Sequence, residues 1–315
     1  MARDAWVGGV DAGGSHSVAV IVDARGNELA RAQGPGAAVH AGNEAASADT
    51  ITRLVADAAR RAAGHGIEAL VVGAAGAGHP PVRAALTQQL LTRGAPPLTQ
   101  VVTDAEAAFA SAFGDGPGIL VLSGTGSIAL ARDPAGAWHR AGGWGWRVGD
   151  EGSGFAIGRA GVAAVGRALD GRGAGTSLSE VLPQAAGVAD AAALMAWARG
   201  ATPAMVAALA GAVQGEARRG DTVSDGIVRA AAGDLAAHVA ALQSRFPAST
   251  VIPVVLAGGA LRPDSPLRAA VGEVAAGMAQ VAIHDRPVDA ALAAAWLAQR
   301  LVAGRPEGAS GGSRA

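Results

Sequence analysis

The sequence contains no cysteine, no tyrosine and no lysine, so all 25 of its basic residues are arginine. The lack of cysteine excludes disulfide bonds, cysteine-ligated zinc, iron–sulfur clusters and thiol nucleophiles. Aromatic residues make up only 3% of the chain. The abundance of Ala, Gly and Arg is explained most simply by a G/C-rich genome, so this bias says little about function.

Features of a nucleic-acid-binding, secreted or membrane protein are also missing. The formal net charge of -1 gives no strong attraction to nucleic acid or to an anionic membrane surface. The start of the chain, Met1 to Trp6, lacks the basic and then apolar pattern of a signal peptide. Arg, Asp, Glu or Gln interrupts the Ala-rich stretches, so none predicts a membrane span. We therefore expect a cytoplasmic protein.

The chain is long and apolar enough for one large or two ordinary domains, with 315 residues of which 50% are hydrophobic. The first part predicts three strands joined by tight turns, followed by alternating helices and strands. The strands are expected at 7–10, 17–22, 28–33, 69–73 and 99–102, and the helices at 43–63, 80–91 and 105–113.

The same pattern then restarts, which indicates an internal duplication of a βββαβα unit. The second set of strands is expected at 118–122, 128–132, 137–141, 251–256 and 281–283, with a mostly helical region up to about 249. We predict an α/β fold with domains at 1–113 and 114–287. A final helix at 288–302 packs back onto the first domain, and 304–315 forms a disordered tail. Two such domains facing each other would form a cleft that grips a nucleotide from both sides.

The first candidate site is the turn from Asp11 to Ser17, between two apolar strands. Gly13 and Gly14 let the backbone approach a ligand closely, and successive N–H groups suit phosphate oxygens. Asp11 is a candidate holder of a hydrated Mg²⁺, and Ser15 adds a hydroxyl. An ordinary hairpin turn is the alternative.

A second turn of glycines and hydroxyls lies at the equivalent point of the repeat, from Ser123 to Ser127. Gly124, Thr125 and Gly126 are its candidate phosphate-binding residues. The turn is not a P-loop, because the GxxxxGK[ST] pattern is absent. It is not a dinucleotide fingerprint either, because no helix follows it directly. The recurrence at equivalent positions favours phosphate binding over two plain hairpins.

Asp104 follows a buried strand and stands at the start of a helix. It is either an N-cap, a position where Asp is favoured, or a general base that takes a hydroxyl proton during phosphoryl transfer. A carboxylate at the carboxyl end of a strand suits the second role.

Two further stretches are candidates for ligand contact. The segment 142–154 places two of the six tryptophans among glycines and two adjacent carboxylates, which suits a sugar-binding loop or a structural loop with packed tryptophan. Gly258 and Gly259 follow a buried strand, where small residues either accept a flat adenine or permit close helix–strand packing. The seven histidines show no HExxH or similar metal-binding spacing.

Together these motifs resemble the N-acetylglucosamine kinase family, which belongs with the BadF-type ATPases in the actin–hexokinase–Hsp70 group. The resemblance rests on five stretches in the family's order and spacing, and it covers about residues 7 to 302. The stretches are Val10–Ser15, Thr103–Ala105, Leu122–Ser127, Gly142–Gly145 with Gly149–Ser153, and Ala257–Ala260.

The resemblance implies two ribonuclease-H-like, actin-like ATPase domains that close over ATP–Mg²⁺ and an amino sugar. It implies transfer of the γ-phosphate to the sugar 6-hydroxyl, with Asp104 as the catalytic base and as a sugar contact. The residues that would bind ATP are Asp11 (through Mg²⁺ and water), Gly13, Gly14, Ser15, Gly124, Thr125, Gly126, Gly258 and Gly259. The residues that would bind the sugar are Gly143, Trp144 and Asp150.

The sequence departs from the family pattern in the loop after the third strand. The family usually places an Asn there to bond sugar hydroxyls, and a gapless reading puts Ala38 at this position. His40 and Asn43 are candidates to take its place. Ala12 replaces a customary Gly, and Ser15 a usual Thr. Because a site that bonds a hydroxyl discriminates strongly by it, the change bears on which sugar is used.

The leading hypothesis is an ATP-dependent amino-sugar kinase acting on N-acetylglucosamine or glucosamine, and we expect a homodimer. One alternative is an ATPase that drives a partner's conformational change, like the activators of radical dehydratases, but these hold an iron–sulfur cluster through cysteine. The other is a sugar sensor without turnover. Repressor relatives add a DNA-binding helix-turn-helix, for which an ATPase domain starting near residue 7 leaves no room.

Overall fold

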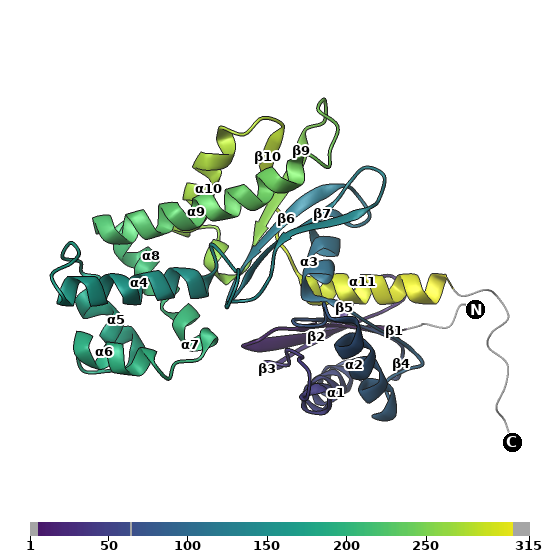
Figure 1. Ribbon diagram of the computed structural model, residues 1–315. Coiled ribbons are helices and arrows are strands. Elements are labelled where there is room, and N and C mark those ends of the chain that lie inside the picture. Colours follow the sequence, from purple (N-terminus) through teal and green to yellow (C-terminus); the bar gives the residue numbers. More distant parts are fainter. Residues whose placement is uncertain (1–5, 64, 305–315) are drawn as a thin grey trace, which may run out of the picture. The chain divides into compact units, whose positions relative to one another are not determined.

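The computed structural model describes residues 6–63 and 65–304 of the chain (Figure 1). They form two compact units. Unit 1 holds the described residues up to Gly114 together with those from Val288 onward, and unit 2 runs from Asp115 to Pro287. The predicted tail at 304–315 lies outside the described residues except for Gly304, which caps the last helix.

Unit 1 is built on a five-stranded mixed sheet in the order β3-β2-β1-β4-β5. Its strands are β1 (Trp6–Ala12), β2 (His16–Val22), β3 (Glu28–Pro35), β4 (Ile67–Ala74) and β5 (Leu98–Thr103). The first three strands pair antiparallel, as their short turns require, whereas β1, β4 and β5 run parallel. The carboxyl ends of β1, β4 and β5 therefore meet at one edge of the sheet.

Helices cover both faces of this sheet (Figure 1). They are α1 (Glu44–Arg61), α2 (Pro80–Thr92), α3 (Asp104–Phe113) and α11 (Ala290–Ala303). Successive strand residues point to opposite faces. Val10 accordingly packs with α1 and α2, while Val7 packs with α3 and α11.

Helix α11 lies directly on β1. A Cβ atom added to Gly9 would stand 2.1 Å from the backbone nitrogen of Ala295 and 2.2 Å from the carbonyl oxygen of Ala291. Only glycine therefore allows α11 to approach β1 this closely. After Pro287 the chain returns to unit 1, and α11 then covers, together with α3, the face of the sheet on which Val7 lies.

Unit 2 repeats the sheet of unit 1, with the strand order β10-β9-β6-β7-β8. Its strands are β6 (Gly118–Ser123), β7 (Ser127–Arg132), β8 (Trp138–Gly142), β9 (Ile252–Ala257) and β10 (Val281–His284). Strands β6, β7 and β8 pair antiparallel, and β6, β9 and β10 pair parallel. The two-domain α/β fold and its internal duplication, both predicted from sequence, are confirmed.

The helical part of unit 2 surrounds a core that includes Leu178, Leu182, Leu194 and Val213. The helices are α4 (Gly154–Leu169), α5 (Leu178–Ala186), α6 (Ala191–Ala198), α7 (Pro203–Ala208), α8 (Ala210–Arg218), α9 (Thr222–Gln243), the 3₁₀ turn η1 (Gly259–Leu261) and α10 (Pro266–Ala276). Among the described residues no single helix is long and apolar enough to cross a membrane, although the bent pair of α5 and α6 meets the length and composition criteria together.

Candidate active site

Asp11 is the next-to-last residue of β1, at the edge where the parallel strands end. Its neighbours Val10 and Ala12 face α1 and α2, so the side chain of Asp11 points to the face covered by α3 and α11. It pairs with Gly73 on β4. A Cβ atom at Gly73 would stand 2.7 Å from the Cβ of Ala107 on α3. The missing side chain at Gly73 thus lets α3 pack close beside Asp11.

Asp104 is the first residue of α3 rather than its N-cap. Thr103 is the N-cap: its side chain accepts a hydrogen bond from the Glu106 amide at 3.0 Å, and the Glu106 carboxylate accepts one from the Thr103 amide at 2.6 Å. The N-cap alternative for Asp104 is therefore wrong. The Asp104 Oδ1 atom accepts a hydrogen bond from the Ala105 amide at 3.0 Å. Burial raises the pKa of the Asp104 carboxyl above its usual value.

The structure brings Asp11 and Asp104 to the same edge of the sheet. Asp104 follows β5, which is separated from β1 by β4 alone, so about 10 Å of sheet lies between their backbones. Their side chains interact electrostatically. The pKa of Asp11 is raised to about 6, first by burial and then by the negative charge of Asp104, with a smaller contribution from Asp289 and an opposing one from His16.

A buried carboxylate with a raised pKa destabilises the folded protein when it is ionised. The pKa of Asp11 rises from 3.8 to about 6 on folding. The ionised carboxylate therefore lowers the stability of the folded protein at pH 7, and this loss of stability disappears as the pH falls from about 6 to below 3.8. We expect Asp11→Asn to be more stable than wild type by about 3 kcal/mol at pH 7, with the difference shrinking to about 0.5 kcal/mol at pH 4. Urea unfolding at both pH values measures it. Equal stabilities at pH 7 would contradict the assignment.

The turn after β1 leaves part of its backbone free for a ligand. The Gly13 amide donates to the His16 carbonyl at 3.2 Å, and the Gly13 carbonyl accepts from the amides of Ala37 and Ala38 at 3.0 and 3.1 Å. The amides of Gly14 and Ser15 have no acceptor within the part of the chain that the structure describes. Two of the three predicted residues thus present free N–H groups, whereas the Gly13 amide is used by the turn itself.

The loop after β3 offers no unbonded side-chain amide that could replace the Asn of the family pattern. The Nδ2 atom of Asn43 donates to the Ala38 carbonyl at 3.0 Å, and its Oδ1 accepts from the His40 amide at 2.7 Å. Asn43 therefore shapes this loop. The Nδ1 atom of His40 lies 3.1 Å from the Ala41 carbonyl, and its side chain is exposed. Position 38 itself carries only a methyl group.

The turn after β6 is one residue shorter than the turn after β1, and its first glycine amide is likewise used within the turn. The Gly124 amide donates to the Gly126 carbonyl at 2.9 Å. Over the described ranges, 6–63 and 65–304, the amides of Thr125 and Gly126 have no acceptor. Each unit therefore offers two free adjacent amides, at Gly14 and Ser15 or at Thr125 and Gly126, which is the arrangement that binds phosphate oxygens.

Asp150, predicted to bind sugar, lies directly on this second turn. A Cβ atom at Gly126 would stand 2.7 Å from the Asp150 Oδ2 atom. Burial raises the pKa of Asp150, while hydrogen bonds from the backbone amides of Ser127 and Gly145 oppose that rise. The backbone of Asp150 has a φ of 59°, in the left-handed region that non-glycine residues rarely adopt. The carboxylate is thus held at a defined position beside the turn.

Hydrogen bonds join residues 150–155 to the turn along its length. The Ser123 hydroxyl donates to the Gly152 carbonyl at 2.8 Å, and the Ser127 hydroxyl donates to the Glu151 carbonyl at 2.6 Å. The Gly154 amide donates to the Gly124 carbonyl at 2.8 Å. The sequence predicted a phosphate turn and a sugar loop as separate features, and Ser123 and Ser127 join them into one structure.

Trp144 is exposed and carries a cation on its face. Its side chain is 65% exposed, which excludes the alternative that it is packed in the core. The guanidinium of Arg140 lies 3.9 Å from its ring centre. Gly143 has a φ of 70°, and a Cβ there would stand 2.8 Å from the Ile128 side chain. The loop therefore presents Trp144 as a flat, accessible surface.

Gly258 packs against the same turn from the side of β9. Its φ is 102°, and an added Cβ would stand 2.4 Å from the Ser123 carbonyl oxygen. Gly258 therefore packs closely against the end of β6, where a side chain has no room. A Cβ at Gly259 would meet nothing within 4 Å, so that position has room for a ligand. All three predicted motifs of unit 2 thus meet around Ser123.

The residues present fit one hydrated Mg²⁺ at Asp11. No group of three or more His, Asp or Glu side chains able to hold a metal ion occurs within 6–63 and 65–304. Mg²⁺ bound together with nucleotide needs only one or two carboxylates, with waters and phosphate oxygens completing its shell. The half-buried carboxylate of Asp11, with its raised pKa, would be stabilised by a nearby cation.

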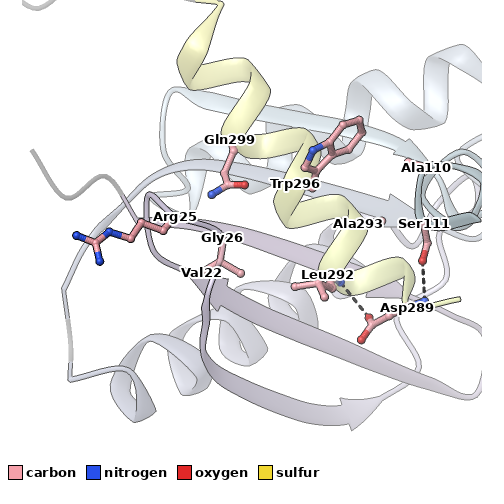
Figure 2. Close-up of a pocket in the computed structure, with 10 residues that line it drawn as sticks. All are labelled: Val22, Arg25, Gly26, Ala110, Ser111, Asp289, Leu292, Ala293, Trp296 and Gln299. Atoms are coloured by element: carbon pink, nitrogen blue, oxygen red, sulfur yellow. Dashed lines mark hydrogen bonds between the residues drawn. The ribbon is translucent and has the colours of Figure 1, made fainter. Parts of the chain in front are cut away.

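A separate pocket of unit 1, about 440 Å³ in volume, lies between α3, α11 and the β2–β3 turn (Figure 2). Its lining includes Trp296, Arg25 and Asp289 but neither Asp11 nor Asp104. Asp289 is the N-cap of α11, accepting from the Leu292 amide at 3.0 Å, and its own amide donates to the Ser111 hydroxyl at 2.9 Å. These bonds fix the start of α11 to α3, but the pocket is distinct from the candidate active site.

This fold is that of a known class of ATPase. Residues 9–298 match the BadF/BadG/BcrA/BcrD ATPase family, so the chain belongs to that family. The chain is 34% identical over 176 residues to an N-acetylmuramic acid/N-acetylglucosamine kinase of Clostridium acetobutylicum. The aligned part covers 55% of this chain and 58% of the relative.

Two further proteins are similar. An N-acetyl-D-glucosamine kinase of Dictyostelium discoideum is 29% identical over 209 residues, covering 63% of this chain and 65% of the relative. The chain thus spans less than two thirds of the length of these curated relatives. The crystal structure of a protein from Chromobacterium violaceum, named as a candidate N-acetylglucosamine kinase, has a TM-score of 0.77 and 29% identity, covering 93% of this chain and 99% of that one.

Proposed function

We propose that the protein is an ATP-dependent amino-sugar kinase that phosphorylates the 6-hydroxyl of N-acetylglucosamine or glucosamine. The placement of Asp104 carries this proposal. Its partly buried carboxylate does not cap the helix, and it stands at the same edge of the sheet as Asp11. The names of the similar proteins, two N-acetylglucosamine kinases among them, support the choice of acceptor.

In this mechanism Asp104 takes the proton of the sugar hydroxyl as the hydroxyl oxygen attacks the γ-phosphorus of ATP; the bond from that phosphorus to the β–γ bridging oxygen breaks, and ADP leaves. The free amides of Gly14, Ser15, Thr125 and Gly126 bind phosphate oxygens and stabilise the charge that develops on them. Bound Mg²⁺, held through water by Asp11, would neutralise further phosphate charge. The role of the chain is therefore mostly to position the reactants and to stabilise charge.

Unit 2 would provide the sugar contacts. The exposed ring of Trp144 suits packing against a sugar face, and the fixed carboxylate of Asp150 can accept hydrogen bonds from sugar hydroxyls. Since Asp150 and the free amides of the second turn belong to one hydrogen-bonded structure, sugar and phosphate recognition are linked there.

N-acetylmuramic acid is a second candidate acceptor. The Clostridium acetobutylicum relative is named for both N-acetylmuramic acid and N-acetylglucosamine. Ala38 removes the side chain with which the family bonds sugar hydroxyls, and Asn43 is committed to its own loop. A site with fewer bonds to hydroxyls discriminates less against a sugar that carries a substituent on one of them.

The proposal is tested by ADP release from ATP–Mg²⁺ in the presence of a panel of sugars. We expect N-acetylglucosamine or glucosamine to raise the rate at least about 100-fold over the sugar-free background, as a positioned acceptor should. Glucose and galactose are the matched sugars without the amino group. Sugar-independent ADP release would favour the ATPase alternative, and sugar binding without ADP release would favour the sensor. Either result would overturn the proposal.

A further inference from the structure

The loop 143–153, which joins β8 to α4, packs at both ends against one face of α9. At its start, a Cβ atom on Gly142 would stand 2.7 Å from the Cε1 and 2.8 Å from the Nε2 of His238. At its end, a Cβ on Gly152 would stand 2.5 Å from the Leu235 Cγ and 2.7 Å from the Ala231 carbonyl oxygen. Ala231, Leu235 and His238 are spaced four and three residues apart, so they share one helix face.

His238 is a polar residue of this face. Its side chain is only 12% exposed, and its Nε2 atom lies 3.7 Å from the Glu151 Oε2 atom. Its Nδ1 atom is buried and has no hydrogen-bond partner within the described ranges. Asp234 precedes it by one helical turn. Burial raises the pKa of Asp234, the charge of Glu151 raises it further and His238 lowers it.

We propose that His238 is a positioning residue that holds the loop 143–153 on α9 through Glu151, and so fixes the sugar contacts of the loop. The proposal rests on the proposed function in that Trp144 and Asp150 are taken as sugar contacts. No substrate contact is assigned to His238 itself, because it lies on the α9 side of the loop.

Glu151 is the residue through which this positioning acts. On the side of the turn, the Ser127 hydroxyl donates a hydrogen bond of 2.6 Å to the Glu151 carbonyl. On the side of α9, His238 faces the Glu151 carboxylate. Glu151 is thereby held on both sides. It directly follows Asp150, whose left-handed φ of 59° is a conformation that persists only when the surroundings impose it. Release of Glu151 from α9 therefore lets Asp150 relax away from its position beside Gly126.

Hydrogen–deuterium exchange of the full chain without ligand tests the positioning independently of activity. We expect His238→Ala and Glu151→Gln to speed exchange in peptides covering 143–153 by roughly two- to fivefold, with peptides of the β1–β2 turn unchanged. His284→Ala removes an exposed histidine of the same unit and is the matched control. It should leave exchange in this loop unchanged.

Steady-state kinetics tests the consequence for the sugar. We expect both variants to raise the KM for the sugar by roughly two- to fivefold, with kcat and the KM for ATP changed by less than about 1.5-fold. The double variant His238→Ala/Glu151→Gln should resemble each single variant, because both act through one contact. His238→Gln fills more of the same space and serves if His238→Ala fails to fold.

Three outcomes separate the possibilities. Unchanged exchange in 143–153 in the folded variants would overturn the proposal, whatever the kinetics show. Multiplicative effects of the two substitutions on the KM for the sugar would overturn it as well, because His238 and Glu151 would then act separately. If no sugar supports ADP release by the wild type, the proposed function fails, whereas exchange still decides whether His238 holds the loop.

Discussion

Replacement of Asp104 by Asn is expected to lower kcat for sugar phosphorylation roughly 1000-fold, the loss typical of a removed general base. Asn keeps the size and the hydrogen-bonding capacity of the side chain but cannot take the hydroxyl proton. The KM for the sugar should change little, since a neutral amide can still bond a hydroxyl. ADP release with saturating sugar measures the effect.

The expected stability of the variant and a matched control separate a loss of catalysis from unfolding. Burial raises the pKa of Asp104, so its charge costs the folded state stability and the Asn variant should be at least as stable as wild type at pH 7. Asp57→Asn, at a half-buried position of α1 where Asp57 pairs with Arg60 and Arg61 outside the candidate site, is the matched control and should keep the wild-type rate. The kcat/KM of wild type should also fall at low pH, where the raised pKa leaves Asp104 protonated. Full activity of Asp104→Asn would refute the assignment of the base.

Replacement of Gly9 by Ala is expected to destabilise unit 1 by at least about 4 kcal/mol. The added Cβ would overlap backbone atoms of α11, at 2.1 Å from the Ala295 nitrogen, so the helix itself has to move. Urea unfolding followed by far-UV circular dichroism measures the loss. Because α11 covers the face of Asp11, sugar-dependent ADP release should be lost as well.

The adjacent glycine provides the control for this substitution. A Cβ at Gly8 would meet the far ends of two flexible side chains, the Cδ1 atoms of Ile67 and Leu70, at 2.9 and 3.0 Å. These ends can turn away, so Gly8→Ala should change stability by about 1 kcal/mol or less. Equal losses for the two variants would show that α11 does not depend on Gly9.

The fold was predictable because its signals are local. Short apolar runs separated by turn residues gave the strands, and their repetition gave the duplication that the two sheets confirm. The capping box at Thr103 and Glu106 was also written in the sequence, as a hydroxyl residue followed three positions later by Glu. Recognising it would have removed the N-cap alternative for Asp104 without a structure.

The internal geometry of the candidate site was not predictable in the same way. The bonds from Ser123 and Ser127 to the loop 143–153 cross 29 and 24 residues of sequence. The approach of His238 to Glu151 depends on how α9 packs against β8. No local pattern encodes such contacts, and nothing in the sequence shows that the side chain of Asn43 is used by its own loop.

Phosphoryl transfer to a sugar is tested most directly by the identity of the product. The full chain is incubated with ATP–Mg²⁺ and N-acetylglucosamine or glucosamine, and the products are followed by ³¹P–¹H correlation NMR. The account predicts one sugar phosphate per ADP, with the phosphorus coupled to the protons on carbon 6. ADP without a sugar phosphate, or phosphorus coupled to another carbon's proton, would contradict it.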